Sequence, residues 1–175
     1  MRAMNLSYTS REQVEVYRFS WPFSVGMPLL LVGLQAFMPV RMHFFRVFDF
    51  GLMLTIFFAV SRRSQLSGML TGAAIGMLQD GLTHTPFGVF GIAKTLVGYG
   101  ASSIGIRIDV ENPGSRFLLT FFFYGIHQVV FVAIERYLMG QSIHLNLGHE
   151  AGAAVANSLM AVALFAMLNR FKIRD

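Results

Sequence analysis

Nine polar or charged residues lie inside the apolar segments of this sequence. Their side chains could bind a ligand, carry a proton or form an ion pair there. They are Gln35, Asp49, Gln79, Asp80, Lys94, His127, Gln128, Glu135 and Asn157. A charge in hydrocarbon costs about 2.5–3.5 kcal/mol on insertion scales, so each charged residue needs a partner or water. Most of the nine fall in the same half of the predicted spans. Together they predict a polar cavity open at that side, which either binds a small solute or is a hydrogen-bond network that fixes the packing.

Asp80 and Lys94 form the predicted ion pair, because they flank one short hairpin that contains Pro86 and Gly88. Lys94 lies about eight residues into its segment, roughly 12 Å from the end at 1.5 Å per residue. The aliphatic stem of a lysine can reach from that depth toward the interface. The alternative is that Lys94 reaches the interface alone and that Asp80 is a solvated span end.

His127 lies nearer the centre of its segment, where a histidine more often bonds to a neighbouring helix than binds a metal or relays protons. Residues 100–103 resemble an intramembrane serine site only loosely. His144, His149 and Glu150 can bind metals, but their spacing in a polar loop is more typical of solvated residues. The metalloprotease, nucleophile-elbow, P-loop and dinucleotide motifs are absent from the sequence. We therefore predict no catalytic residue, no metal site and no cofactor, and a protein that is not an enzyme.

The composition indicates that these residues are positioned by a membrane-embedded helical bundle. Hydrophobic residues make up 54% of the 175 residues and charged residues only 13%, against about 25% charged in soluble domains. This excludes a disordered chain, a coiled coil and an ordinary cytosolic enzyme. The net charge of +5 is interpreted as basic residues at span ends that meet lipid headgroups, and not as nucleic-acid binding. There is no cysteine, hence no disulfide or thiolate metal site.

Six apolar runs of helical length predict six transmembrane helices in a single domain over residues 1–175. They cover residues 21–40, 47–60, 64–81, 87–106, 117–138 and 151–168. The runs are continuous and lack the alternation of a membrane barrel. Residues 1–20 are predicted to be a short cytoplasmic tail, in which Ser10 to Gln13 fit a capping box. The tail then either forms a short amphipathic helix or remains a frayed polar segment.

The distribution of lysine and arginine predicts that both termini face the cytoplasm. Ten basic residues fall on one side of the six-span layout: Arg2, Arg11, Arg18, Arg62, Arg63, Arg107, Arg116, Arg170, Lys172 and Arg174. Three fall on the other side: Arg41, Arg46 and Arg136. Cytoplasmic loops carry the excess of basic residues in membrane proteins.

Gly68, Gly72 and Gly76 recur every four residues and so lie on one helix face. Small residues at this spacing let a second helix approach closely. The favoured interpretation is packing inside the chain's own bundle. The alternative is that this face docks a membrane helix of a partner protein.

The segment 68–100 reads GMLTGAAIGMLQDGLTHTPFGVFGIAKTLVGYG and resembles the core of the MreD family, the bacterial rod shape-determining membrane proteins. The similar features are Gly72, Gly76 and Asp80, then the loop with Pro86 and Gly88, then Gly98-Tyr99. The layout of a small basic chain with about six spans is similar as well.

This resemblance implies a non-enzymatic scaffold of the cell-elongation machinery in the bacterial inner membrane, which supports rod shape and peptidoglycan synthesis. Its implied partner is MreC, with MreB, RodA and the RodA transpeptidase in the wider complex. The family is also similar in fold to the substrate-binding subunits of energy-coupling-factor transporters. The alternative function is therefore a vitamin-binding transporter subunit, and a purely structural membrane anchor is a third possibility.

Overall fold

The computed structural model of this chain describes residues 19–105, 112–141 and 146–171, and every regular element within these ranges is helical. The α-helices are α1 (Trp21–Arg41), α2 (Phe50–Arg62), α3 (Gln65–Thr83), α4 (Val89–Gly105), α5 (Pro113–Ala133) and α6 (Leu147–Leu168). Two short 3₁₀ helices, η1 (His43–Val47) and η3 (Asn169–Phe171), precede α2 and follow α6, and a π-helix, η2 (Ile134–Leu138), continues α5. The predicted all-helical class is confirmed for these ranges, whereas the capping box at Ser10 and His144 lie outside them.

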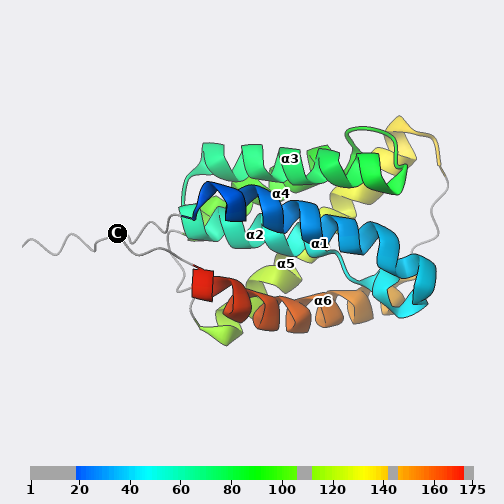
Figure 1. The fold of residues 1–175 in the computed structure, drawn as a ribbon. Helices are drawn as coiled ribbons and strands as arrows, with labels where there is room; N and C mark the ends of the chain where they lie inside the picture. The colour runs from blue at the N-terminus through cyan, green and yellow to red at the C-terminus, as the bar shows by residue number, and fades with distance from the viewer. Residues whose placement is uncertain (1–18, 106–111, 142–145, 172–175) are drawn as a thin grey trace, which may run out of the picture.

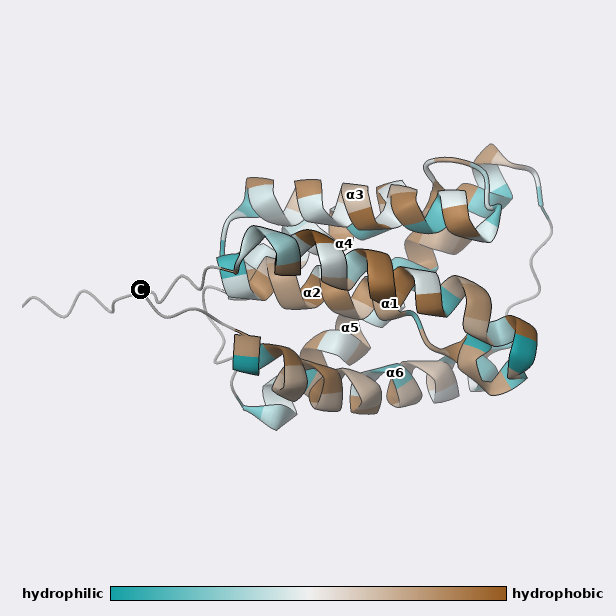
Figure 2. Cartoon of the chain, in the orientation of Figure 1, coloured by the Kyte–Doolittle hydropathy of each residue, from teal (hydrophilic) through white to brown (hydrophobic). Residues whose placement is uncertain are grey.

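The helices alternate in direction between two ends of a bundle (Figure 1). One end holds the start of α1, the α2–α3 junction and the end of α6, so the described parts nearest the two termini lie together. The opposite end holds η1, the α3–α4 loop and η2. Figure 2 shows hydrophobic residues along the helix bodies and hydrophilic residues gathered toward the two ends.

Three helical segments within the described ranges are long and apolar enough to cross a membrane: Trp21–Arg41, Pro113–Leu138 and Leu147–Phe171. By length and composition, these segments are consistent with a helical membrane protein. Helix α2 is apolar but has only 13 residues, and α3 and α4 fall below the same criterion of length and apolarity. Six crossings therefore remain a prediction.

Two predicted boundaries shift because asparagine caps begin the helices early. Asn112 accepts a hydrogen bond from the backbone N–H of Gly114 (2.8 Å), and Pro113 occupies the first turn of α5. Residues 112–114 precede the predicted span, which begins at residue 117, and are thus a helix start. Asn146 likewise accepts from the backbone of Gly148 and His149, so α6 begins four residues before the predicted span.

Helix α2 forms the centre of the bundle. Residues 51–61 are all buried, including Phe57 and Phe58. A helix that is apolar all round must be covered on every side. Helix α2 can be short because the other helices surround it, so that it does not have to match the thickness of a lipid bilayer.

The glycine stripe of α3 packs against α4. Cβ atoms added at Gly68, Gly72 and Gly76 would meet the backbone carbonyls of Gly98, Lys94 and Phe90, respectively. All three glycines are buried. The internal-packing interpretation is correct, and the alternative of a free face for a partner helix is wrong, because α4 already occupies it.

Candidate functional site

Asp49 is the centre of a polar network buried in the bundle. It is the N-cap residue of α2, and its Oδ1 accepts from the backbone N–H of Leu52 (2.8 Å). Aspartate is favoured at this position because it satisfies an unpaired N–H of the first helical turn. The cap directs the carboxylate between the helices, where its second oxygen meets Lys94.

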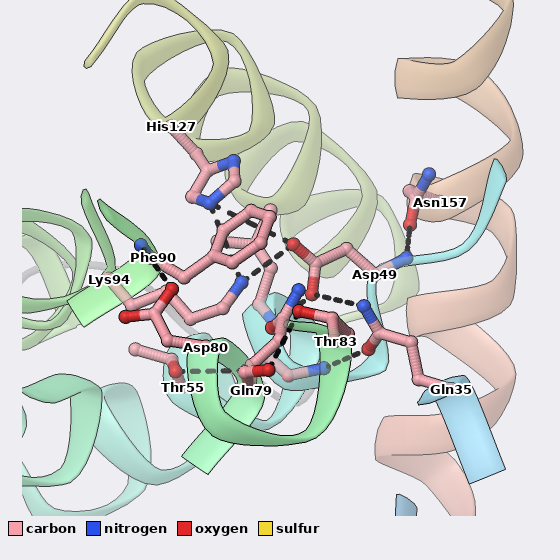
Figure 3. Close-up of polar contacts among 12 residues, drawn as sticks. Gln35, Asp49, Thr55, Gln79, Asp80, Thr83, Phe90, Lys94, His127 and Asn157 are labelled. Atoms are coloured by element: carbon pink, nitrogen blue, oxygen red, sulfur yellow. Dashed lines mark hydrogen bonds and ion pairs between the residues drawn. The ribbon is translucent and has the colours of Figure 1, made fainter. Parts of the chain in front are cut away.

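Lys94 of α4 pairs with Asp49, at 2.6 Å between Nζ and Oδ2. The lysine is fully buried, and its Nζ also lies 5.3 Å from the centroid of the Phe90 ring. Figure 3 shows Lys94 and His127 converging on Asp49 from different helices. A buried charge needs a hydrogen-bonded partner of opposite sign, and the structure supplies one from a distant part of the sequence.

The predicted Asp80–Lys94 pair is wrong, because Asp80 is occupied by backbone groups. Its two oxygens accept from the N–H groups of Gly88 (2.9 Å), Phe90 (3.0 Å) and Gly91 (3.2 Å). The carboxylate therefore closes the α3–α4 loop and supports the first turn of α4. Gly88 has a φ of +101°, which glycine adopts without steric cost.

His127 of α5 lies beside the ion pair. Its Nε2 is 3.5 Å from Lys94 Nζ and 3.8 Å from Asp49 Oδ2. The ring stacks parallel to Phe90, with 5.9 Å between centroids. His127 therefore meets neighbouring helices, as predicted. In the parts of the chain that the structure describes, no group of three metal-binding side chains occurs.

Asn157 and Gln35 extend the network to α6 and α1. Asn157 Oδ1 accepts from the backbone N–H of Asp49 (2.8 Å), and its Nδ2 donates to the carbonyl of Val47 (2.7 Å). Gln35 donates weakly to Asp49 (3.4 Å) and accepts from the backbone of Gly51 (3.0 Å). One network thus joins α1, α2, α4, α5 and α6 at one level.

The remaining predicted polar residues lie at the edge of this network or outside it. Gln79 of α3 is buried, and its Oε1 has no hydrogen-bond partner among the described residues. Gln128 is half-buried, and no described contact joins it to Asp49 or Lys94. Glu135 is buried in η2.

A cavity of about 440 Å³ adjoins the network at the end that holds η1 and the α3–α4 loop. Gln35, Gln79 and Phe90 line its inner part, and Arg46 and His84 also contribute to the wall. Of the nine residues from which a polar cavity was predicted, Gln35 and Gln79 line this one, whereas Asp49, Lys94, His127 and Asn157 belong to the hydrogen-bond network. Its volume lies in the range of small-molecule sites.

The remaining candidate residues, at positions 100–103 and 149–150, make contacts that hold helices together. Ser102 donates to the carbonyl of Gly98 (2.9 Å) inside the α3–α4 contact, so the loose serine-site resemblance has a packing explanation. His149 is largely exposed and lies 3.5 Å from Glu150, which accepts from the Tyr124 hydroxyl (3.2 Å). This contact ties the start of α6 to α5.

Asp80→Ala is expected to loosen the α3–α4 hairpin by about 2 kcal/mol, because it leaves buried backbone donors without an acceptor. Asp80→Asn keeps one acceptor oxygen and should lose less. Proteolysis of the loop at residues 84–88, together with thermal unfolding in detergent, measures the effect. An alanine variant as resistant and as stable as the original protein would show that these three bonds do not hold the loop.

Sequence reasoning identified Lys94, His127 and Asn157 but missed that Asp49 joins them. Asp49 lies near the start of the predicted span 47–60. The usable signal is an aspartate directly before a helical apolar run, the typical N-cap position. The residues around Asp49 in the sequence do not indicate that its partner is Lys94 on α4.

The arrangement pairs a lysine with a carboxylate and gives hydrogen bonds to the amides of Gln35 and Asn157 inside an apolar bundle, and it connects five helices. Comparison of the chain with protein-family models, curated proteins and solved structures gave no match. The fold and the site together are consistent with a helical membrane protein that contains a buried ionic network.

Proposed function

We propose that this chain is a non-enzymatic membrane scaffold of the bacterial cell-elongation machinery. The observation that carries the proposal is the construction of the α3–α4 hairpin. The segment that resembles the MreD core is a single unit, in which Gly72 and Gly76 admit the α4 backbone and Asp80 closes the loop at Gly88. The resembling residues thus share one structural task, which favours a common fold over a chance similarity of composition.

The scaffold acts by binding, with MreC as the direct partner and with MreB, RodA and its transpeptidase in the wider assembly. It lies in the bacterial inner membrane with six spans and both termini in the cytoplasm. The buried network suits this role, because polar contacts between helices hold a fixed arrangement on which a partner can depend. The partner binds on a face other than the glycine stripe.

Depletion of the protein in a rod-shaped host is expected to give round or swollen cells, and affinity capture from native membranes is expected to recover MreC. Cell width and mass spectrometry of the captured proteins are the measurements. An unrelated membrane protein of similar abundance, captured in the same way, serves as the control. Unchanged width after depletion, with no MreC in the captured material, would refute the proposal.

The second candidate function is the substrate-binding subunit of a vitamin transporter. The cavity of about 440 Å³ favours it, because Gln79 presents a buried, unpartnered acceptor at its wall. This function predicts capture of an energy-coupling ATPase module in place of MreC. The same affinity experiment therefore separates the two candidates.

A further inference from the structure

A second cavity, of about 500 Å³, lies between α1 and α3 toward the end of the bundle that holds the start of α1 and the end of α2. Its apolar walls include Trp21, Val25, Leu29, Leu70, Ala74 and Leu78. We call this the α1–α3 groove. Trp21, Leu29 and Leu70 are exposed by 79%, 53% and 63%. Trp21 and Leu29 lie on α1, which is long and apolar enough to span a membrane, and apolar side chains this open are suited to contact with lipid chains.

Arg62, the last residue of α2, adds a cation to this apolar groove. Its guanidinium donates to three hydroxyls: Ser24 on α1 (2.9 Å), and Ser67 (3.3 Å) and Thr71 (3.5 Å) on α3. It also lies 5.3 Å from the centroid of the Phe58 ring. Three helices therefore hold the charge in a fixed place.

All of these acceptors are neutral, and no carboxylate pairs with Arg62 among the described residues. The next residue, Arg63, has a buried Nε without a hydrogen-bond partner in the same described set. Arg62 lines the groove beside these hydroxyl groups, and it offers donors and positive charge to an anion. Arginine is well suited to phosphate, because its planar fork can donate two parallel hydrogen bonds.

We propose that the α1–α3 groove binds one anionic phospholipid, with its phosphate at Arg62 and an acyl chain along Trp21, Val25 and Leu29. These three residues cover two turns of α1, about 12 Å at 1.5 Å per residue. A phospholipid is the occupant that carries both an anion and an apolar chain. An anionic headgroup is specified because no carboxylate pairs with Arg62 among the described residues, whereas a zwitterionic headgroup brings its own cation.

The competing explanation is that Arg62 only connects α1 to α3. That role predicts no preference among headgroups. The test uses the purified full-length chain in detergent, with phosphatidylglycerol or phosphatidylcholine added, and native mass spectrometry to measure bound lipid. We expect retention of phosphatidylglycerol to be about fivefold higher, as for one basic residue at an anionic surface.

Arg62→Gln is expected to abolish this preference, and Arg41→Gln, which removes an exposed charge at the opposite end, is the matched control that keeps it. Ala74→Phe fills the groove without changing Arg62 and should reduce lipid retention even if Arg62→Gln proves unstable. Gel filtration establishes that each variant is folded. Equal retention of the two lipids by the original protein, an unchanged preference in folded Arg62→Gln, or unchanged lipid retention in folded Ala74→Phe would overturn the proposal.

Discussion

Replacing Lys94 by methionine alone is expected to destabilise the protein by about 3–5 kcal/mol, because Asp49 is left as an uncompensated charge beside the apolar core. The 2.6 Å pair is fully buried on the lysine side. The folded fraction after heating in detergent, followed by gel filtration, measures the loss. This is the largest single-residue effect that we expect in this chain.

The double variant Lys94→Met with Asp49→Asn should recover much of that loss, because neither buried position then carries a charge. Asparagine retains an oxygen that can accept from Leu52. The matched control is Lys94→Met with Asp80→Asn, which should not recover, since Asp80 binds backbone groups instead. Additive losses in the first double variant, or recovery in the second, would contradict the assignment of Asp49 as the partner.

Gly72→Leu is expected to cost about 3 kcal/mol or more, because overpacking forces backbone shifts where no side chain can move aside. The added Cβ would meet the backbone carbonyl of Lys94, so even Gly72→Ala should be damaging. Displacing this part of α4 would also move Lys94 away from Asp49. Thermal unfolding and the yield of monodisperse protein are the measurements.

Gly26 provides the matched control for this substitution. It lies in α1, and nothing lies within 4 Å of a Cβ added there. Gly26→Ala should be neutral or slightly stabilising, since alanine is favoured over glycine in a helix by about 1 kcal/mol. Equal behaviour of Gly26→Ala and Gly72→Ala would show that the α3–α4 contact tolerates separation.

The length and composition of the apolar runs are enough to predict the helical class and the approximate position of each helix. Long apolar runs leave backbone groups that only helix hydrogen bonds satisfy within the chain segment, so composition and run length carry this information locally. The spacing of Gly68, Gly72 and Gly76 also predicted close packing correctly. Helix ends were less accurate, as at Pro113 and Leu147, where capping asparagines started helices inside predicted loops.

Which polar side chains contact one another depends on the three-dimensional arrangement of the helices. Lys94 has one carboxylate nearby in sequence and another 45 residues away, and it pairs with the distant Asp49 because the α3–α4 loop engages Asp80. Asn157 bonds to Asp49 across 108 residues. Such pairings depend on how helices are arranged around α2, and helix–helix arrangement is set by packing over the whole bundle. Local residue patterns therefore identify the polar groups, and the three-dimensional fold selects their partners.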